Sequence, residues 1–316
     1  MRIGIQLECQ EAIDWETARR VARAADELGY DSLWCSDHVY SQRADPDRAS
    51  VDPFLLLAVL AAETTRIELG TLVTAVCFRP PSIVGRMAAH LDALSGGRFT
   101  LGIGAGWGEG EHRAYGLPFP PARERVSRLD EAVRLLRALW RGGPVDFEGE
   151  HYRLEQAYCH PRPRNGDLPL LVGGSGRRTM RIAARHAEEW NVVALTLESW
   201  TEQDADFRRA CEEVGRDPRS VRRSQVSGVL VGRDERGLRA HLERVADRIP
   251  ALAGREPERA MASLRRRGWL VGTPREIVDE LGRRAEAGQD RMMLEHHTGG
   301  DLQALELLAA EVLPEL

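Results

Sequence analysis

The stretch that decides the fold runs from Leu168 to Val193 and reads LPLLVGGSGRRTMRIAARHAEEWNVV. Its apolar start, residues 168–172, predicts a strand, and the glycines within residues 173–176 predict a tight turn. Apolar residues from Met180 to Ala187 then recur at helical spacing, and residues 190–194 form a second apolar strand. The stretch therefore predicts a strand–helix–strand unit, which is the building block of a parallel sheet.

The glycine turn within this stretch is also a candidate phosphate site, formed by Gly173, Gly174, Ser175, Gly176 and Arg177. A turn of this kind leaves backbone N–H groups at the positive end of a helix, where an anion is favoured. A tight turn that binds nothing is the alternative. The residues are similar to the dinucleotide-binding fingerprint but lack its third glycine, so the rest of the chain must decide which phosphate would bind.

The composition excludes several classes of protein. All 44 basic residues are arginine, so mechanisms that need a lysine, such as Schiff-base aldolase, pyridoxal-phosphate or P-loop chemistry, are absent. The net charge of -5 gives no reason to expect nucleic-acid binding. There is no apolar run of membrane-spanning length, so no membrane association is expected.

The cysteines and the N-terminus predict a cytoplasmic protein. The five cysteines are scattered and include no Cys-x-x-Cys pair, which fits free thiols in a reducing compartment. The chain starts directly as a strand and lacks the apolar region of a secretory leader. No His-Glu-x-x-His or paired-cysteine pattern is present, so no metal is expected.

Alternating strands and helices predict the fold. Eight short apolar strands, nearly all followed by a helix, favour a closed (β/α)₈ barrel over a doubly wound sheet. We expect a single barrel domain over residues 1–316, with a hairpin insertion near 145–160 and a helical insertion near 250–268. Residues 104–121 are expected to form a long glycine-rich loop. The eight predicted strands are residues 3–7, 32–35, 67–73, 99–103, 168–172, 190–194, 226–231 and 291–294.

In a barrel the functional residues gather at the carboxyl ends of the strands. Asp37 and His38 bring an acid and a base together after a buried strand, although a helix cap would also explain them. The glycine run after the fourth strand would let a flat ring lie on the backbone, although a mobile loop is the alternative. Further polar residues at these ends are Glu8, Gln10, Glu109, Glu111, His112, Glu295, His296 and His297, the last two expected in a structural or rim role.

Four further segments resemble the luciferase-like oxidoreductases, in particular the branch that uses the deazaflavin coenzyme F420. The glycine turn at 173–176 is also similar to the phosphate loop of that family. The four segments are LGYDSLWCSDH (28–38), LGTLVT (69–74), SGGRFTLGIGAGW (95–107) and EHRAYGLPF (111–119).

The resemblance implies a (β/α)₈ barrel that binds F420, or FMN as the alternative, at its carboxyl mouth. Asp37 would meet the polar edge of the ring system, and Leu72 and Val73 would form a non-proline cis bulge behind the ring. The glycine turn would hold the phosphate. The cofactor-binding residues implied are Asp37, Thr71, Leu72, Val73, Ala105, Gly106, Trp107, Gly173, Gly174, Ser175, Gly176 and Arg177.

The implied chemistry is hydride transfer between C5 of the deazaflavin and an organic substrate. His38 is the first candidate for the accompanying proton transfer, because an imidazole titrates near neutrality, and Glu8 is the second. Trp107 stands where the sugar-phosphate dehydrogenases of the family carry a catalytic glutamate, so we expect an apolar substrate.

Two other functions fit the same residues. One is an FMN-dependent monooxygenase that relies on a separate flavin reductase. The other is a non-catalytic flavin-binding protein. The family resemblance also implies a homodimer.

Overall fold

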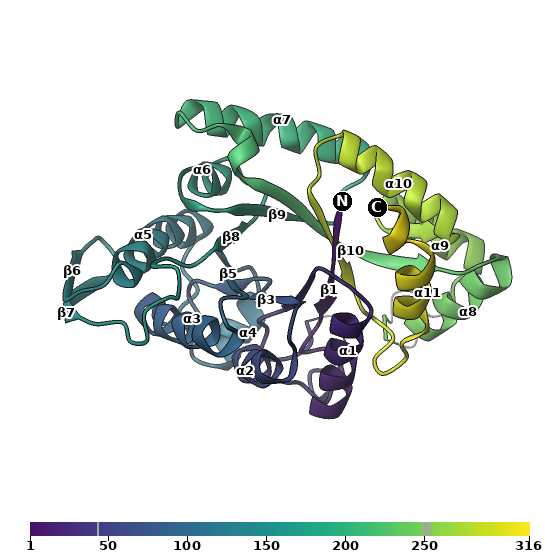
Figure 1. Ribbon diagram of the computed structural model, residues 1–316, viewed down its shortest axis with the longest axis horizontal. Coiled ribbons are helices and arrows are strands. Elements are labelled where there is room, and N and C mark those ends of the chain that lie inside the picture. The colour runs from purple at the N-terminus through teal and green to yellow at the C-terminus, as the bar shows by residue number, and fades with distance from the viewer. Residues whose placement is uncertain (43, 247, 250–251, 253) are drawn as a thin grey trace.

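The computed structural model describes residues 1–42, 44–246, 248–249, 252 and 254–316. Within these ranges, parallel strands close into a ring that helices surround (Figure 1), which confirms the predicted (β/α)₈ barrel. The last strand pairs with the first, Ile3 lying opposite Met292. In order around the ring the strands are β1 (Arg2–Leu7), β2 (Ser32–Cys35), β3 (Glu68–Thr71), β5 (Phe99–Gly104), β8 (Leu170–Gly173), β9 (Glu189–Val193), β10 (Arg222–Val231) and β12 (Arg291–Glu295).

The helices cover the outside of the ring and bury their apolar faces against it. Carboxylate and hydroxyl caps start several of them: Asp14 Oδ1 accepts from Thr17 N at 2.7 Å, and Thr273 forms a capping box with Glu276. The covering helices are α1 (Trp15–Glu27), α2 (Pro53–Glu63), α3 (Pro81–Ser95), α5 (Ala122–Trp140), α6 (Arg177–His186), α7 (Leu197–Glu213), α10 (Pro274–Glu286) and α11 (Gln303–Glu311), with 3-10 turns η1 (Pro218–Ser220) and η3 (Leu313–Glu315).

Residues 104–121 depart from the long loop predicted for them. Glu109–Ala114 forms the short helix α4, whose residues Glu111 and His112 are buried. A helix of six residues has little stability of its own, so tertiary contacts rather than a periodic pattern hold it. Two short strands were also not predicted: β4 (Thr74–Ala75) pairs with β5, and β11 (Leu270–Gly272) pairs with β10.

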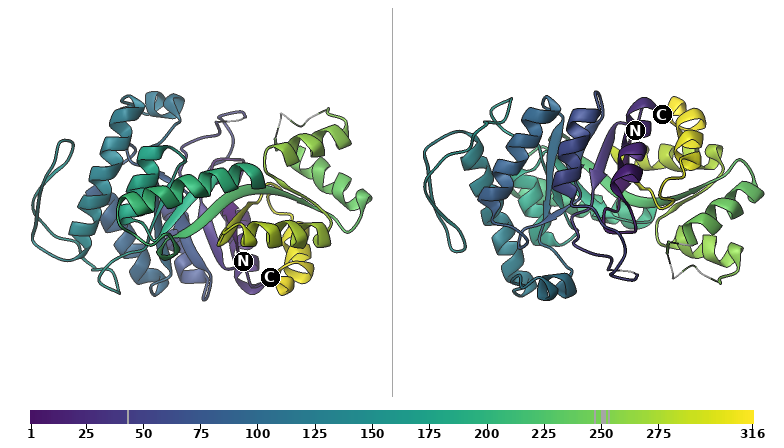
Figure 2. Two further views of the ribbon diagram at one scale, coloured as in Figure 1. Left: turned by 90° about the horizontal axis from the view of Figure 1, so that it is seen from above. Right: turned by 90° about the horizontal axis from the view of Figure 1, so that it is seen from below.

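Two additions project from opposite ends of the molecule (Figure 2). At one end, β6 (Val145–Glu148) and β7 (Arg153–Ala157) form an antiparallel hairpin. At the other, α8 (Glu235–Ala246) and α9 (Pro257–Arg266) share a small apolar core with β11. The predicted insertion near 250–268 thus includes α9, while its residues 250, 251 and 253 lie outside the described ones.

None of the described helices has both the length and the apolar content needed to cross a membrane.

A buried ion cluster closes the amino-terminal end of the barrel. The guanidinium of Arg291, at the start of β12, is fully buried. It lies 3.0 Å from a carboxylate oxygen of Glu189 and 2.8 Å from one of Asp31, and it also contacts Glu68. The indole of Trp34 lies against it inside the barrel, with its ring centre 5.5 Å away. Removing one partner of a buried ion pair typically costs about 3–5 kcal/mol, because the other charge is left uncompensated.

The β3–β5 contact gives a test of the barrel's packing. A Cβ on Gly102 would lie 1.9 Å from the backbone oxygen of Thr71, which cannot move aside. We expect Gly102→Ala to lower the free energy of unfolding by about 1–3 kcal/mol or more, measured by urea denaturation. Gly282→Ala is the matched control, since this exposed helical glycine has open space around it and should gain about 1 kcal/mol. Equal effects of the two substitutions would contradict the prediction.

Candidate active site

The carboxyl ends of the strands enclose a cavity of about 470 Å³, which is the size of a small-molecule or cofactor site. We call it the main cavity. Among its lining residues are ten of the predicted site residues: Glu8, Asp37, His38, Leu72, Val73, Ala105, Gly106, Trp107, Gly173 and Gly174. Glu111 and Glu295, which the sequence placed at the strand ends without a specific role, also line it. The other lining residues are Gln6, Ser36, Ala75, Phe78, Gly104, Thr179, Asn191, Val193 and Val226.

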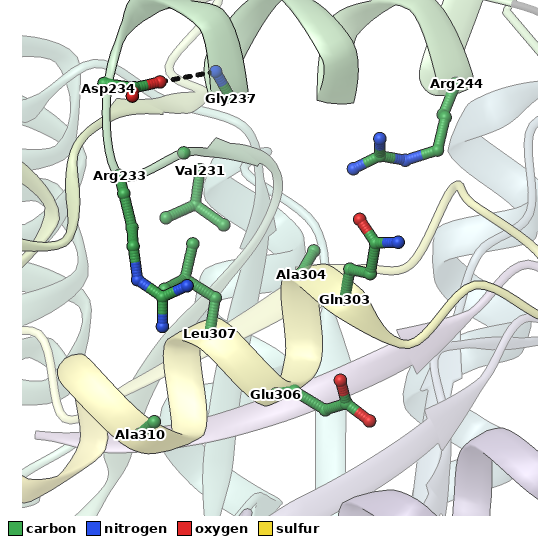
Figure 3. Close-up of a pocket in the computed structure, with 11 residues that line it drawn as sticks. Val231, Arg233, Asp234, Gly237, Arg244, Gln303, Ala304, Glu306, Leu307 and Ala310 are labelled. Atoms are coloured by element: carbon green, nitrogen blue, oxygen red, sulfur yellow. Dashed lines mark hydrogen bonds between the residues drawn. The ribbon is translucent and has the colours of Figure 1, made fainter.

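A second cavity, of about 490 Å³, lies outside the barrel between α8 and α11 (Figure 3). Its two arginines already have partners: Arg233 contacts Glu311 at 2.6 Å and Arg244 contacts Asp301 at 2.6 Å. None of the predicted site residues lines it. The main cavity is therefore the candidate active site.

His38 is paired with a buried carboxylate from the unpredicted helix α4. Its Nδ1 lies 2.8 Å from Oε1 of Glu111, whose other oxygen accepts a hydrogen bond from the backbone N–H of Val39. Burial lowers the pKa of His38, but the hydrogen bond and charge of Glu111, helped by the charges of Glu8 and Asp37, raise it above its ordinary value overall. The surroundings of His38 therefore favour its imidazolium form more than water does.

Asp37 faces the same cavity with a different balance of charge. Its side chain is buried, and Oδ2 accepts a hydrogen bond from Arg79 Nη1 at 2.7 Å. Burial raises the pKa of Asp37, and the charge and hydrogen bond of Arg79 oppose that rise. Arg79 thus partly compensates this carboxyl group, which lies beside His38 at the end of β2.

One wall of the main cavity is formed by Leu72, Val73 and the glycines 104 and 173. The Leu72–Val73 peptide bond is cis, as the resemblance implied. The Val73 side chain occupies the space that Cβ atoms on Gly104 and Gly173 would need, since these would lie 2.8 and 3.1 Å from its methyl carbons. Thr71 does not line the cavity but supports this wall from behind, exchanging two hydrogen bonds with the backbone of Gly102.

The glycine turn lies at the edge of the main cavity. Gly173, Gly174 and Thr179 line the cavity, whereas Ser175, Gly176 and Arg177 do not. Helix α6 begins after Gly176, which has no side chain, so no N-cap side chain accepts a hydrogen bond from the first N–H groups of the helix. Arg177 is exposed and bonds Glu213 at 3.0 Å. The phosphate-binding role of the turn stays a prediction.

The comparisons with known proteins identify the family. The family model described as luciferase-like monooxygenase matches residues 2–291. The chain belongs to this family. It is 31% identical to the F420-dependent glucose-6-phosphate dehydrogenase of Intrasporangium calvum, over 100% of this chain and 99% of that protein. It is 29% identical to the F420-dependent hydroxymycolic acid dehydrogenase of Mycobacterium tuberculosis, over 99% of this chain and 88% of that protein. The predicted family is thus confirmed.

Other alignments to curated relatives are shorter. The chain spans about half the length of two further F420-dependent glucose-6-phosphate dehydrogenases. For that of Nakamurella multipartita the identity is 38%, over 53% of this chain and 49% of that protein. For that of Kineococcus radiotolerans the identity is 40%, over 51% of this chain and 47% of that protein.

The solved structures support the fold. The chain superposes on an F420-dependent secondary alcohol dehydrogenase with a TM-score of 0.83 at 22% identity, over 99% of this chain and 98% of that one. The tetrahydromethanopterin reductase of Methanopyrus kandleri gives 0.82 at 21% identity, over 99% of each chain.

The His38–Glu111 pair predicts a pH dependence. We expect Glu111→Gln to lower the pKa of His38, because burial still disfavours the imidazolium while its charged partner is gone. The stability from this pair should be complete below about pH 6.5, the ordinary histidine pKa, and lost as the pH rises through the raised pKa.

The measurement is an NMR titration of the imidazole protons of both proteins. The signal of His90, exposed on α3, serves as the internal control and should be unaffected. If the pKa of His38 stayed the same or rose in the variant, Glu111 would not be the group that raises it.

Proposed function

We propose that this protein is an F420-dependent oxidoreductase that transfers a hydride between C5 of the deazaflavin and an apolar organic substrate. The observation that carries the proposal is the main cavity itself, which is lined both by the residues of the cis Leu72–Val73 bond and by the His38–Glu111 pair. The relatives named as F420-dependent dehydrogenases over the whole length of this chain support the same cofactor.

The residues present fit a planar cofactor with a phosphate-bearing tail. The wall formed by Val73, Gly104 and Gly173 offers the methyl groups of Val73 and the backbone of the two glycines, against which a ring system would lie. Asp37 would meet the polar edge of the ring, and the start of α6 would receive the phosphate. The bound deazaflavin would supply the hydride acceptor or donor.

His38 would carry the proton that must accompany the hydride. Because Nδ1 is engaged by Glu111, the other ring nitrogen, Nε2, is the atom available to the substrate. In reduction of a carbonyl, His38 donates its Nε2 proton to the oxygen, and its raised pKa favours the protonated form that this step needs. In oxidation of an alcohol, His38 accepts the hydroxyl proton, which requires a pH above that pKa.

Apolar groups at the mouth support an apolar substrate. Trp107 is 63% exposed, and its ring lies edge-on to His38 with the ring centres 5.3 Å apart. Val193, at the end of β9, is 65% exposed and lines the same cavity. An apolar substrate would cover both side chains and gain the free energy of removing them from water.

A homodimer and a cytoplasmic location also belong to the proposal. The family resemblance supports the dimer, and the five free cysteines support the location.

The second candidate is an FMN-dependent monooxygenase, which the name of the matching family model favours. Titration of the purified protein with each cofactor separates the two candidates. We expect the deazaflavin to bind at least tenfold more tightly than FMN. The reverse order would support the monooxygenase, and binding without turnover of any substrate would support a non-catalytic protein.

The role of His38 is tested in the loaded enzyme. We expect His38→Ala to lower kcat by about 10²–10⁴-fold, the usual worth of general acid–base catalysis, while the affinity for the deazaflavin changes little. His90→Ala, at an exposed site on α3, is the control. An unchanged kcat in His38→Ala would exclude His38 as the proton carrier.

The preference for an apolar substrate is tested at Trp107. We expect Trp107→Ala to raise KM for apolar secondary alcohols by roughly tenfold, because the apolar indole surface that the substrate would cover is lost. Trp107→Phe should recover part of the effect. Trp15→Ala, at a tryptophan on α1 that is 42% exposed, should have no effect. If turnover of every apolar substrate stayed unchanged in Trp107→Ala, Trp107 would play no part in substrate binding.

A further inference from the structure

A pocket rich in arginine lies at the end of the barrel opposite to the main cavity. It is bounded by the carboxyl ends of α5 and α6 and by the segments that lead into β8, β9 and β10, so it adjoins the amino ends of these strands. Its volume is about 460 Å³. We call it the arginine pocket. Its lining residues are Arg134, Arg137, Ala138, Arg141, Asp167, Arg185, His186, Glu188 and Arg216.

Two of the five arginines hold neighbouring elements together. The side chain of Arg137 is only 13% exposed and pairs with Asp167 at 3.0 Å and with Glu188 at 2.6 Å. The guanidinium of Arg216 donates to two backbone oxygens at the end of α6, at 3.0 and 2.8 Å, and to Ser220. The carboxyl end of a helix favours such a cation. Arg216 is therefore fixed in place by neutral acceptors, which leave its charge uncompensated.

Positive charge exceeds negative charge in the arginine pocket. Five arginines line it against two carboxylates, and Arg137 pairs with both of these carboxylates. Arg134 has a carboxylate partner one turn away on α5, at 3.2 Å, which does not line the pocket. Within the described part of the chain, no carboxylate pairs with Arg141, Arg185 or Arg216. Because the chain as a whole has a net charge of -5, this excess of positive charge is local.

The imidazole of His186 is sensitive to this excess of positive charge. Burial is the main cause that lowers the pKa of His186 below its ordinary value. The charges of Arg137, Arg185 and Arg134 lower it further, and the charge of Asp130 opposes them. An anion in the pocket would compensate the arginine charges and so favour the imidazolium form.

We infer that the arginine pocket binds a small anion that carries two or more negative charges on phosphate or carboxylate groups. Arg216 supplies a positive charge that is already fixed in position. Arg141 and Arg185, which have no protein partner among the described residues, can each donate two parallel hydrogen bonds to such a group. The inference does not rest on the proposed function, because the arginine pocket and the main cavity share no lining residue.

Binding of pyrophosphate and of citrate to the full chain tests the inference. Both are measured by calorimetry at an ionic strength held constant with sodium chloride, so that screening is the same throughout. We expect saturable binding of at least one of them. Tighter binding of pyrophosphate would assign the site to phosphate groups, and tighter binding of citrate would assign it to carboxylate groups. If neither anion binds, the inference is wrong.

Substitutions then locate the bound anion. Arg141→Gln and Arg185→Gln should each weaken its binding by about tenfold, because a charge-assisted hydrogen bond is lost. Arg275→Gln is the matched control, since it removes the same charge from an exposed position on α10 and should leave the dissociation constant unchanged. Equal losses in all three variants would show that only the net charge of the chain matters, and would overturn the inference.

The pKa of His186 gives a second readout, within the pocket itself. In an NMR titration, the bound anion should raise the pKa of His186, while the exposed His90 on α3 should be unaffected. In the double variant Arg141→Gln/Arg185→Gln the same anion concentration should no longer shift it. An anion that bound at the start of α6, where the cofactor phosphate is proposed to lie, would leave His186 unchanged. That result would contradict the arginine pocket without bearing on the proposed function.

Discussion

The buried charge of Arg291 constrains the whole ring. A guanidinium without access to water is tolerated only where carboxylates surround it, and here they come from Asp31, Glu68 and Glu189. These residues stand at the amino ends of β2, β3 and β9, so one side chain of β12 joins strands from across the barrel. The cluster seals the end of the barrel away from the active site. The carboxyl ends are left free to carry polar, partly exposed groups that contribute chemistry rather than closure.

The order of the ring could be predicted from the sequence because its strands are short, apolar and separated by helices of regular period. The glycine turn at 173–176 is an example, since counting the predicted strands shows that it follows the fifth of eight. Three elements could not be found in this way. They are helix α4 and strands β4 and β11, which have six, two and three residues, too few to show a period.

The places of Asp37 and His38 at the cavity were predictable, because both directly follow a short buried strand. A contact was not predictable where the partner of a residue comes from a distant segment. Glu111 lies 73 residues from His38 and Trp269 lies 28 residues before His297, and only the folded chain shows that each pair is in contact. Arg177 adjoins the glycine turn in sequence, and in the folded chain its guanidinium pairs with Glu213 on α7. Its part in a phosphate site stays a prediction.

The exposure of Trp107 has a thermodynamic consequence. An indole that is 63% exposed carries a shell of water that a ligand seated beside His38 would release. Release of water from apolar surface gives association a negative change in heat capacity, so the binding enthalpy becomes more favourable as the temperature rises. A ligand that stays on the far side of the cavity, near Glu295, would leave this shell in place. The temperature dependence of the heat of binding therefore distinguishes a ligand that reaches the mouth from one that does not.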